Sequence, residues 1–106
     1  MKSSVYYIYI IRCSNNLLYT GITTNLERRF NEHQNSTKGA KFTRANKPKS
    51  IEIVFESPSR SSASKLEYAI KKLPKFKKEA LISKTETLNS LWKDQFNDIT
   101  YHVINN

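Results

Sequence analysis

The sequence predicts a small α+β domain in which helices flank a three-stranded, mainly antiparallel sheet, in the order β-β-α-β-α-α. Two apolar runs separated by turn residues predict a hairpin, and later stretches combine apolar periodicity with helix-start signals. The chain of 106 residues is of the size of one domain, and its 38% hydrophobic residues suffice for one core.

The hairpin comes first in the chain. Residues 5–12 are β-branched and aromatic almost throughout, which is typical of a central strand. The polar turn 14–16 and the short apolar run 17–19 follow, and Gly21 is expected to end the second strand. A third strand is predicted over the alternating segment 51–56.

The helices are predicted from capping signals and apolar stripes. Thr24 and Glu27 have the spacing of a capping box, and Pro74 separates two apolar stripes. The expected helices cover residues 26–34, 63–73 and 75–82, with a last amphipathic helix over 88–96.

The charge of the chain is concentrated in its first part. Residues 1–83 carry 16 basic and 6 acidic side chains, whereas residues 84–106 carry 2 and 3. We expect a main domain over 1–83 and a C-terminal extension over 84–106, with a short docking helix and a frayed end. The formal net charge of +9 favours a nucleic-acid partner over an anionic membrane, and an excess of lysine that serves solubility is the alternative.

Several classes of protein are disfavoured by composition. The longest apolar run, residues 5–11, is too short for a membrane helix and has no cleavage site of a signal peptide after it. Cys13 is the single cysteine, so it cannot form an internal disulfide, and with two histidines it cannot complete a four-ligand zinc site. A cytoplasmic location is expected.

Polar side chains occur at positions where the predicted helices should be apolar. His33 falls on the apolar side of helix 26–34 with Arg29 beside it, and both groups can bind phosphate. A core histidine with satisfied hydrogen bonds is the alternative for His33. Glu67 lies at the edge of the second apolar stripe, where it can bind a metal or form an ion pair with Lys71.

Two tyrosines complete the set of candidates. Tyr9 and Tyr19 share a face of the sheet if an odd number of residues closes the hairpin or a bulge shifts its register. A three-residue turn over 14–16 would achieve this. Core packing is the alternative for each ring.

These residues together resemble the GIY-YIG nuclease superfamily, in particular its small stand-alone proteins, and the likeness covers about residues 5–82. Tyr7 stands at the first glycine of the GIY motif and Thr20 at the isoleucine of YIG, and the interval between the motifs is short. The matching segments are Tyr7-Ile8-Tyr9, Tyr19-Thr20-Gly21, Arg29 with His33, Gly39 to Arg44, and Glu67.

The resemblance implies a ββαβα domain that cuts phosphodiester bonds with one divalent metal, Mg²⁺ or Mn²⁺. It implies that Glu67 binds the metal and that Arg29 grips the scissile phosphate. Tyr9 would orient or deprotonate the attacking water, and nearby cations are expected to lower its pKa. His33 would accept the proton or hold the phenol in place, with Tyr19 as the alternative proton carrier.

Basic residues outside this set predict contacts with the backbone of a nucleic acid, DNA rather than RNA, although a solvated face is the alternative for those after Glu67. They are Lys38, Lys41, Arg44, Lys47, Lys49, Lys71, Lys72 and Lys75. The expected function is a metal-dependent endonuclease acting on branched, damaged or single-stranded DNA, as DNA repair requires. A basic binding module without activity, and an adaptor that binds a protein through Trp92 and Phe96, are the alternatives.

Overall fold

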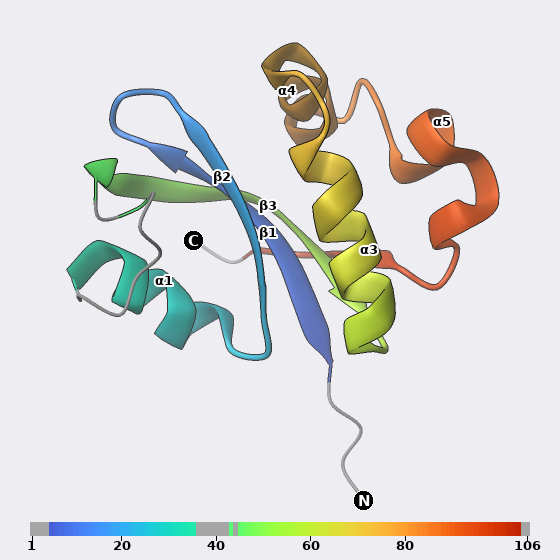
Figure 1. The fold of residues 1–106 in the computed structure, drawn as a ribbon, viewed down its shortest axis with the longest axis horizontal. Coiled ribbons are helices and arrows are strands. Elements are labelled where there is room, and N and C mark those ends of the chain that lie inside the picture. The colour runs from blue at the N-terminus through green and yellow to red at the C-terminus, as the bar shows by residue number, and fades with distance from the viewer. Residues whose placement is uncertain (1–4, 36–42, 44, 105–106) are drawn as a thin grey trace, which may run out of the picture.

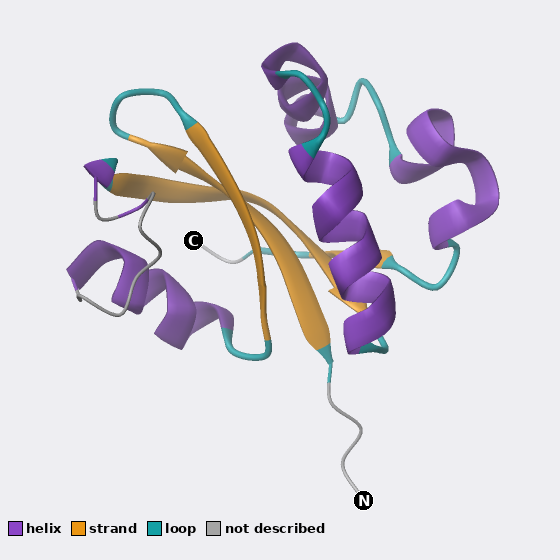
Figure 2. Ribbon diagram, in the orientation of Figure 1, coloured by secondary structure: helices purple, strands orange, loops and turns teal. Residues whose placement is uncertain are grey.

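The computed structural model describes residues 5–35, 43 and 45–104, and within them it shows the predicted α+β architecture (Figures 1 and 2). The elements in chain order are β1 (Tyr6–Cys13), β2 (Leu18–Thr23), α1 (Leu26–Asn35), β3 (Pro48–Ser57), α3 (Arg60–Lys71), α4 (Lys75–Ser83), α5 (Leu88–Trp92), the 3-10 helix η1 (Lys93–Phe96) and β4 (Thr100–His102).

The sheet is antiparallel throughout, in the order β2-β1-β3-β4. Helix α3 packs on one face and α1 on the other (Figure 1). Alternation along β1 explains this arrangement, because Ile8 and Ile10 point toward α3 while Tyr9 and Ile11 point toward α1.

The fourth strand, β4, was not predicted. Strand β4 is only three residues long, which is too short to show a strand pattern in the sequence. It forms because it pairs with β3. Val54 lies opposite His102 and Phe55 opposite Tyr101, whose rings pack with centroids 5.1 Å apart. Ile104, placed by sequence in the frayed end, packs against the cluster of Tyr9, and residues 105–106 lie outside the described part.

The hairpin has the predicted three-residue turn. The Cys13 N–H donates to the Leu17 carbonyl at 2.8 Å, and Asn16 adopts φ of 70°, which asparagine tolerates well. Gly21 does not end the second strand, contrary to prediction. Strand β2 runs on to Thr23, with Gly21 paired opposite Tyr9.

Helix boundaries differ from the predictions where side-chain caps decide them. Helix α1 is capped by Asn25, whose Oδ1 accepts from the Arg28 N–H at 3.0 Å, so the predicted Thr24 box is wrong. Helix α3 begins at residue 60, before the predicted 63, because Ser59 accepts from the Ser62 N–H at 3.1 Å.

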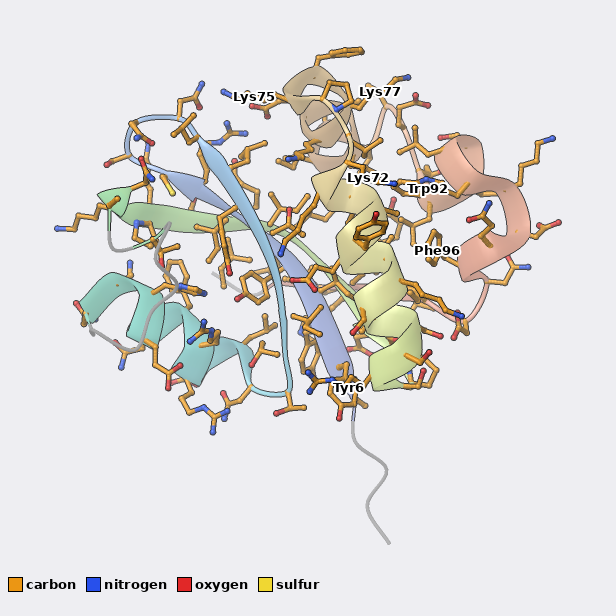
Figure 3. The ribbon with its side chains drawn as sticks, viewed as in Figure 1. Tyr6, Lys72, Lys75, Lys77, Trp92 and Phe96 are labelled. Atoms are coloured by element: carbon orange, nitrogen blue, oxygen red, sulfur yellow. The ribbon has the colours of Figure 1, made fainter. Side chains whose placement is uncertain are left out.

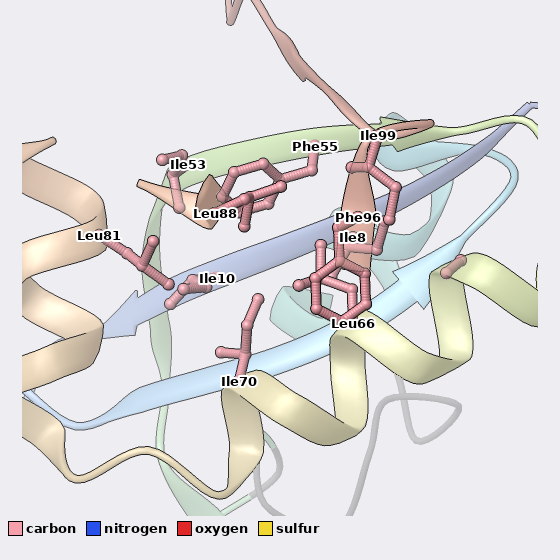
Figure 4. Packing of buried hydrophobic residues seen from close by; sticks show 11 residues of the cluster. Ile8, Ile10, Ile53, Phe55, Leu66, Ile70, Leu81, Leu88, Phe96 and Ile99 are labelled. Carbon is pink, nitrogen blue, oxygen red and sulfur yellow. The ribbon is translucent and has the colours of Figure 1, made fainter. Parts of the chain in front are cut away.

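The predicted helix 88–96 is interrupted. Lys93 has φ of 52°, which a continuous α-helix does not allow, so α5 ends at Trp92 and η1 follows. Both pieces still dock. Leu88 and Phe96 join the main core formed by β1, β3 and α3 (Figure 4). In the described residues no helix has the length and apolarity needed to cross a membrane.

Candidate active site

The face of the sheet covered by α1 holds a buried tyrosine at its centre. Tyr9 is 2% exposed, and its ring lies 6.4 Å from that of Tyr19, measured between centroids. A Cβ atom on Gly21 would lie 2.5 Å from the Tyr9 hydroxyl oxygen and 3.2 Å from the Tyr19 ring. The glycine therefore provides the space in which the two rings sit.

A chain of hydrogen bonds leads from Tyr9 into the protein. The Tyr9 hydroxyl lies 2.9 Å from His33 Nε2, and His33 Nδ1 lies 2.7 Å from the hydroxyl of Thr43. His33 and Thr43 are each 2% exposed. Burial, with the charge of Arg29, lowers the pKa of His33 to about 4, so the imidazole is neutral near pH 7.

The phenol of Tyr9 is harder to ionise than free tyrosine. Burial raises its pKa above the ordinary value and Tyr19 raises it further, while a hydrogen bond from Arg29 opposes both. The prediction that cations would lower this pKa is therefore wrong, because desolvation outweighs them.

A neutral His33 accepts a hydrogen bond at one ring nitrogen and donates at the other. With its proton on Nδ1, it accepts from the Tyr9 hydroxyl at Nε2 and donates to the Thr43 hydroxyl. This is the tautomer in which the imidazole can take a proton from the phenol.

Arg29 is a partly exposed cation in contact with this chain of hydrogen bonds. Its Nη1 binds Glu32 Oε1 at 2.9 Å, and its guanidinium also hydrogen-bonds to Tyr9. The side chain is 27% exposed, so part of its planar donor set can reach an external phosphate.

Glu67 lies on α3, and its negative charge adds, after burial and Tyr19, to the causes that raise the pKa of Tyr9. Glu67 Oε2 also lies 3.1 Å from Lys71 Nζ. The ion pair with Lys71, one of the two alternatives left open by the sequence, is therefore present.

The fold thus brings Tyr9, Tyr19, Arg29 and His33 into contact from β1, β2 and α1, and Glu67 on α3 acts on Tyr9 through its charge. The remaining basic residues are spread around this site. Lys47 and Lys49 are exposed at the start of β3, and Lys71 lies at the end of α3. Lys72 follows α3, and Lys75 begins α4 (Figure 3). Lys38, Lys41 and Arg44 lie outside the described residues.

The comparison with protein families decides what this site is related to. The family model described as the GIY-YIG catalytic domain matches residues 5–80. The chain belongs to the GIY-YIG family. The likeness inferred from the motifs is thereby confirmed, and with it membership of a nuclease superfamily.

Individual relatives are similar to this chain over most of its length. A UPF0213 protein of Desulfotalea psychrophila is 44% identical over 81 residues, which cover 76% of this chain and 74% of the relative. One from Vibrio cholerae serotype O1 is 44% identical over 91 residues, 83% of this chain and 87% of the relative. The solution NMR structure of a UPF0213 protein from Bacillus halodurans is 36% identical, covers 85% of this chain and 95% of its own, and superposes with a TM-score of 0.50.

Two residues of the candidate site lie in segments that carry the resemblance but were not predicted from the sequence to be site residues. Thr43 carries no local signal, because nothing in a threonine ten residues after His33 shows that it will bind the imidazole. Gly21 does carry one, since a glycine within a strand often marks the close approach of another group.

Proposed function

We propose that this protein is a metal-dependent endonuclease that hydrolyses phosphodiester bonds in DNA. The observation that carries the proposal is the buried chain from Tyr9 through His33 to Thr43, in which Tyr9 hydrogen-bonds to Arg29 and is influenced by the charge of Glu67. A tyrosine needed only for packing would not require a buried, neutral histidine hydrogen-bonded to it. Such a chain suits the removal of a proton from water.

The proton path follows from the protonation states. As a water oxygen attacks phosphorus, one of its protons passes to Tyr9 Oη while the phenolic proton passes to His33 Nε2. The bond from phosphorus to the leaving oxygen breaks, and the leaving oxygen takes its proton from solvent. Tyr9 never has to exist as a free phenolate, which its raised pKa disfavours. Tyr19, packed 5.2 Å from His33 between ring centroids, is the second candidate proton carrier.

Substrate binding makes His33 a better base. The charge of Arg29 is one cause of the lowered pKa of His33. A phosphodiester bound to Arg29 offsets that charge, so the imidazole gains basicity when the substrate is in place. Arg29 then holds the non-bridging oxygens and stabilises the charge that develops on them.

The donor set at Glu67 fits a hydrated magnesium or manganese ion. Mg²⁺ keeps several waters and takes one or two protein carboxylates, and Glu67 supplies one carboxylate with a side chain 22% exposed. Lys71 must turn away from Glu67 for the carboxylate to serve. When bound, such an ion would stabilise negative charge on the phosphate and on the leaving oxygen.

Tyr7, at the glycine position of the GIY motif, does not argue against activity. Its ring packs edge-on against His102 of β4, with centroids 5.0 Å apart. Tyr7 packs against the cluster of Tyr9 on the same face of the sheet, and it replaces none of the residues proposed to react.

The proposed substrate is branched, damaged or single-stranded DNA. Exposed lysines suit phosphate contacts, which carry no base sequence. Binding supported in this way weakens steeply as salt is added.

The proposal is tested by incubating the protein with plasmid, fork, flap and single-stranded substrates in Mg²⁺, Mn²⁺ or chelator. We expect cutting with metal, none with chelator, and loss of cutting in Glu67→Gln. Glu86→Gln is the matched control, because this glutamate pairs with Lys77 outside the site, and it should cut normally. Salt-sensitive binding without cutting under any metal would overturn the enzyme and leave a binding module.

A further inference from the structure

A second candidate binding surface lies on the other side of α3 from Glu67. There α3, α5 and η1 enclose an open groove of about 610 Å³, which we call the α3–α5 groove. Its lining includes Lys65, Tyr68, Lys72, Trp92, Gln95 and Phe96. Lys72, Trp92 and Phe96 are labelled in Figure 3, where they lie close together between the two helices.

The groove combines aromatic surface with positive charge. Tyr68 is 63% exposed, and Lys72 Nζ lies 4.6 Å from the centre of its ring. The half-buried Trp92 packs edge-on against Phe96, with centroids 5.4 Å apart. Among the residues that the structure describes, no acidic side chain lines the groove. Aromatic faces beside lysines suit bases and phosphates of single-stranded nucleic acid.

The groove and Glu67 lie on different sides of α3, at a distance that one nucleic-acid strand can span. Glu67 and Tyr68 are neighbours on α3, and successive helical side chains point about 100° apart, so one faces the site while the other faces the groove. A strand that crosses α3 spans about 10–12 Å, the width of a helix with its side chains. Lys71 and Lys72 stand along that path.

We propose that the α3–α5 groove binds an unpaired base of the nucleic acid whose backbone lies in the active site, with Tyr68 as its stacking platform. This rests on the proposed function for the site itself, and it narrows the substrate to nucleic acid with a single-stranded segment beside the cut. A base within a duplex remains stacked on its neighbours and cannot enter.

A fluorescent side chain, Trp92, lines the α3–α5 groove and can report binding there. Trp92 is the single tryptophan of the chain, so intrinsic fluorescence measures occupancy of the α3–α5 groove directly. A 12-nucleotide oligothymidylate and a hairpin duplex of equal length are titrated at low salt into Glu67→Gln, in which cutting is blocked. The single strand should quench Trp92, and the duplex should leave its emission unchanged.

Variants of exposed aromatic residues distinguish stacking of a base on Tyr68 from general electrostatic attraction of the oligonucleotide to the basic surface. Tyr68→Ala should weaken oligothymidylate binding about tenfold, and Tyr68→Phe, which keeps the ring, should restore it. Phe76→Ala is the matched control. Phe76 is 69% exposed on α4 with Lys77 Nζ 5.9 Å from its ring centre, but it lies outside the groove.

The outcomes distinguish this inference from the proposed function. Quenching that depends on Tyr68, in a wild-type protein that cuts nothing, would support the groove and overturn the endonuclease. Cutting by wild type without any change in Trp92 emission would overturn the groove alone. Equal loss of affinity in Tyr68→Ala and Phe76→Ala, or no binding of single strands, would also overturn it.

Discussion

The phenol of Tyr9 fills the space that a side chain at Gly21 would need. The two residues lie opposite each other on β1 and β2, and a Cβ at position 21 would come within 2.7 Å of the ring carbon that carries the hydroxyl. The Tyr9 ring can therefore occupy its position only because residue 21 has no side chain.

Gly21→Ala should displace the Tyr9 ring, lower the free energy of unfolding by about 1–3 kcal/mol and reduce activity. Backbone strain plays no part, because Gly21 does not have a positive φ. Chemical denaturation measures the loss. In a Tyr9→Ala background the same substitution should cost much less, and an equal cost in both backgrounds would show that the clash is not its cause.

Thr43→Val should reduce kcat about tenfold or more and leave KM unchanged. The substitution removes the acceptor for His33 Nδ1–H, so the tautomer that receives the Tyr9 proton is no longer selected. Thr43→Ser keeps the hydroxyl and should retain activity. Nitrogen NMR shifts of the imidazole would reveal the change of tautomer, and an unchanged tautomer in Thr43→Val would contradict this role.

Activity should persist on the acid side of neutrality. Tyr9, Tyr19, Arg29 and Glu32 surround His33, and its lowered pKa of about 4 keeps it neutral far below the ordinary histidine value. We expect kcat/KM, measured across pH, to fall only as pH approaches 4. An acid limb near pH 6.5 that vanishes in His33→Gln would contradict the buried, neutral histidine.

The same shift couples stability to pH. The folded pKa of His33 lies below the unfolded value of about 6.5, so the unfolded chain binds the proton first as the solution is acidified. This contribution to stability is complete above pH 6.5 and is lost between about pH 6.5 and 4. His33→Gln should remove that part of the pH dependence in urea titrations.

Thr20→Val should stabilise the protein by about 1 kcal/mol, or leave its stability unchanged. The Thr20 hydroxyl is buried and has no hydrogen-bond partner among the described residues, so valine removes a desolvation cost while keeping the shape. Thr23→Val is the control. Thr23 Oγ1 accepts from the Asn25 N–H at 3.1 Å, so its loss should destabilise. A clear loss of stability in Thr20→Val, measured by thermal unfolding, would contradict this reasoning.

Local sequence signals predicted much of the fold and the geometry of the tyrosine pair. Alternation within residues 6–13 set which side chains face each helix, and the three-residue turn set the register that brings Tyr9 and Tyr19 together. Helical periodicity likewise placed His33 on the buried side of α1.

Features that depend on contacts distant in sequence were missed. Strand β4 exists because β3 offers it an edge, and Thr43 matters because the fold brings its hydroxyl to His33. The pKa of Tyr9 was predicted in the wrong direction for a related reason. Neighbouring charges can be counted along a sequence, whereas the depth of burial that outweighs them comes only from the packed structure.

The central claim is that Tyr9 and His33 act as one proton-transfer unit beside Arg29 and Glu67. A double-mutant cycle of single-turnover cleavage rates tests it most directly, with Tyr9→Phe, His33→Gln and the double variant on the best substrate in Mg²⁺. We predict that the double variant is no slower than the slower single variant. Rate losses that multiply in the double variant, or a wild-type rate in either single variant, would contradict the account.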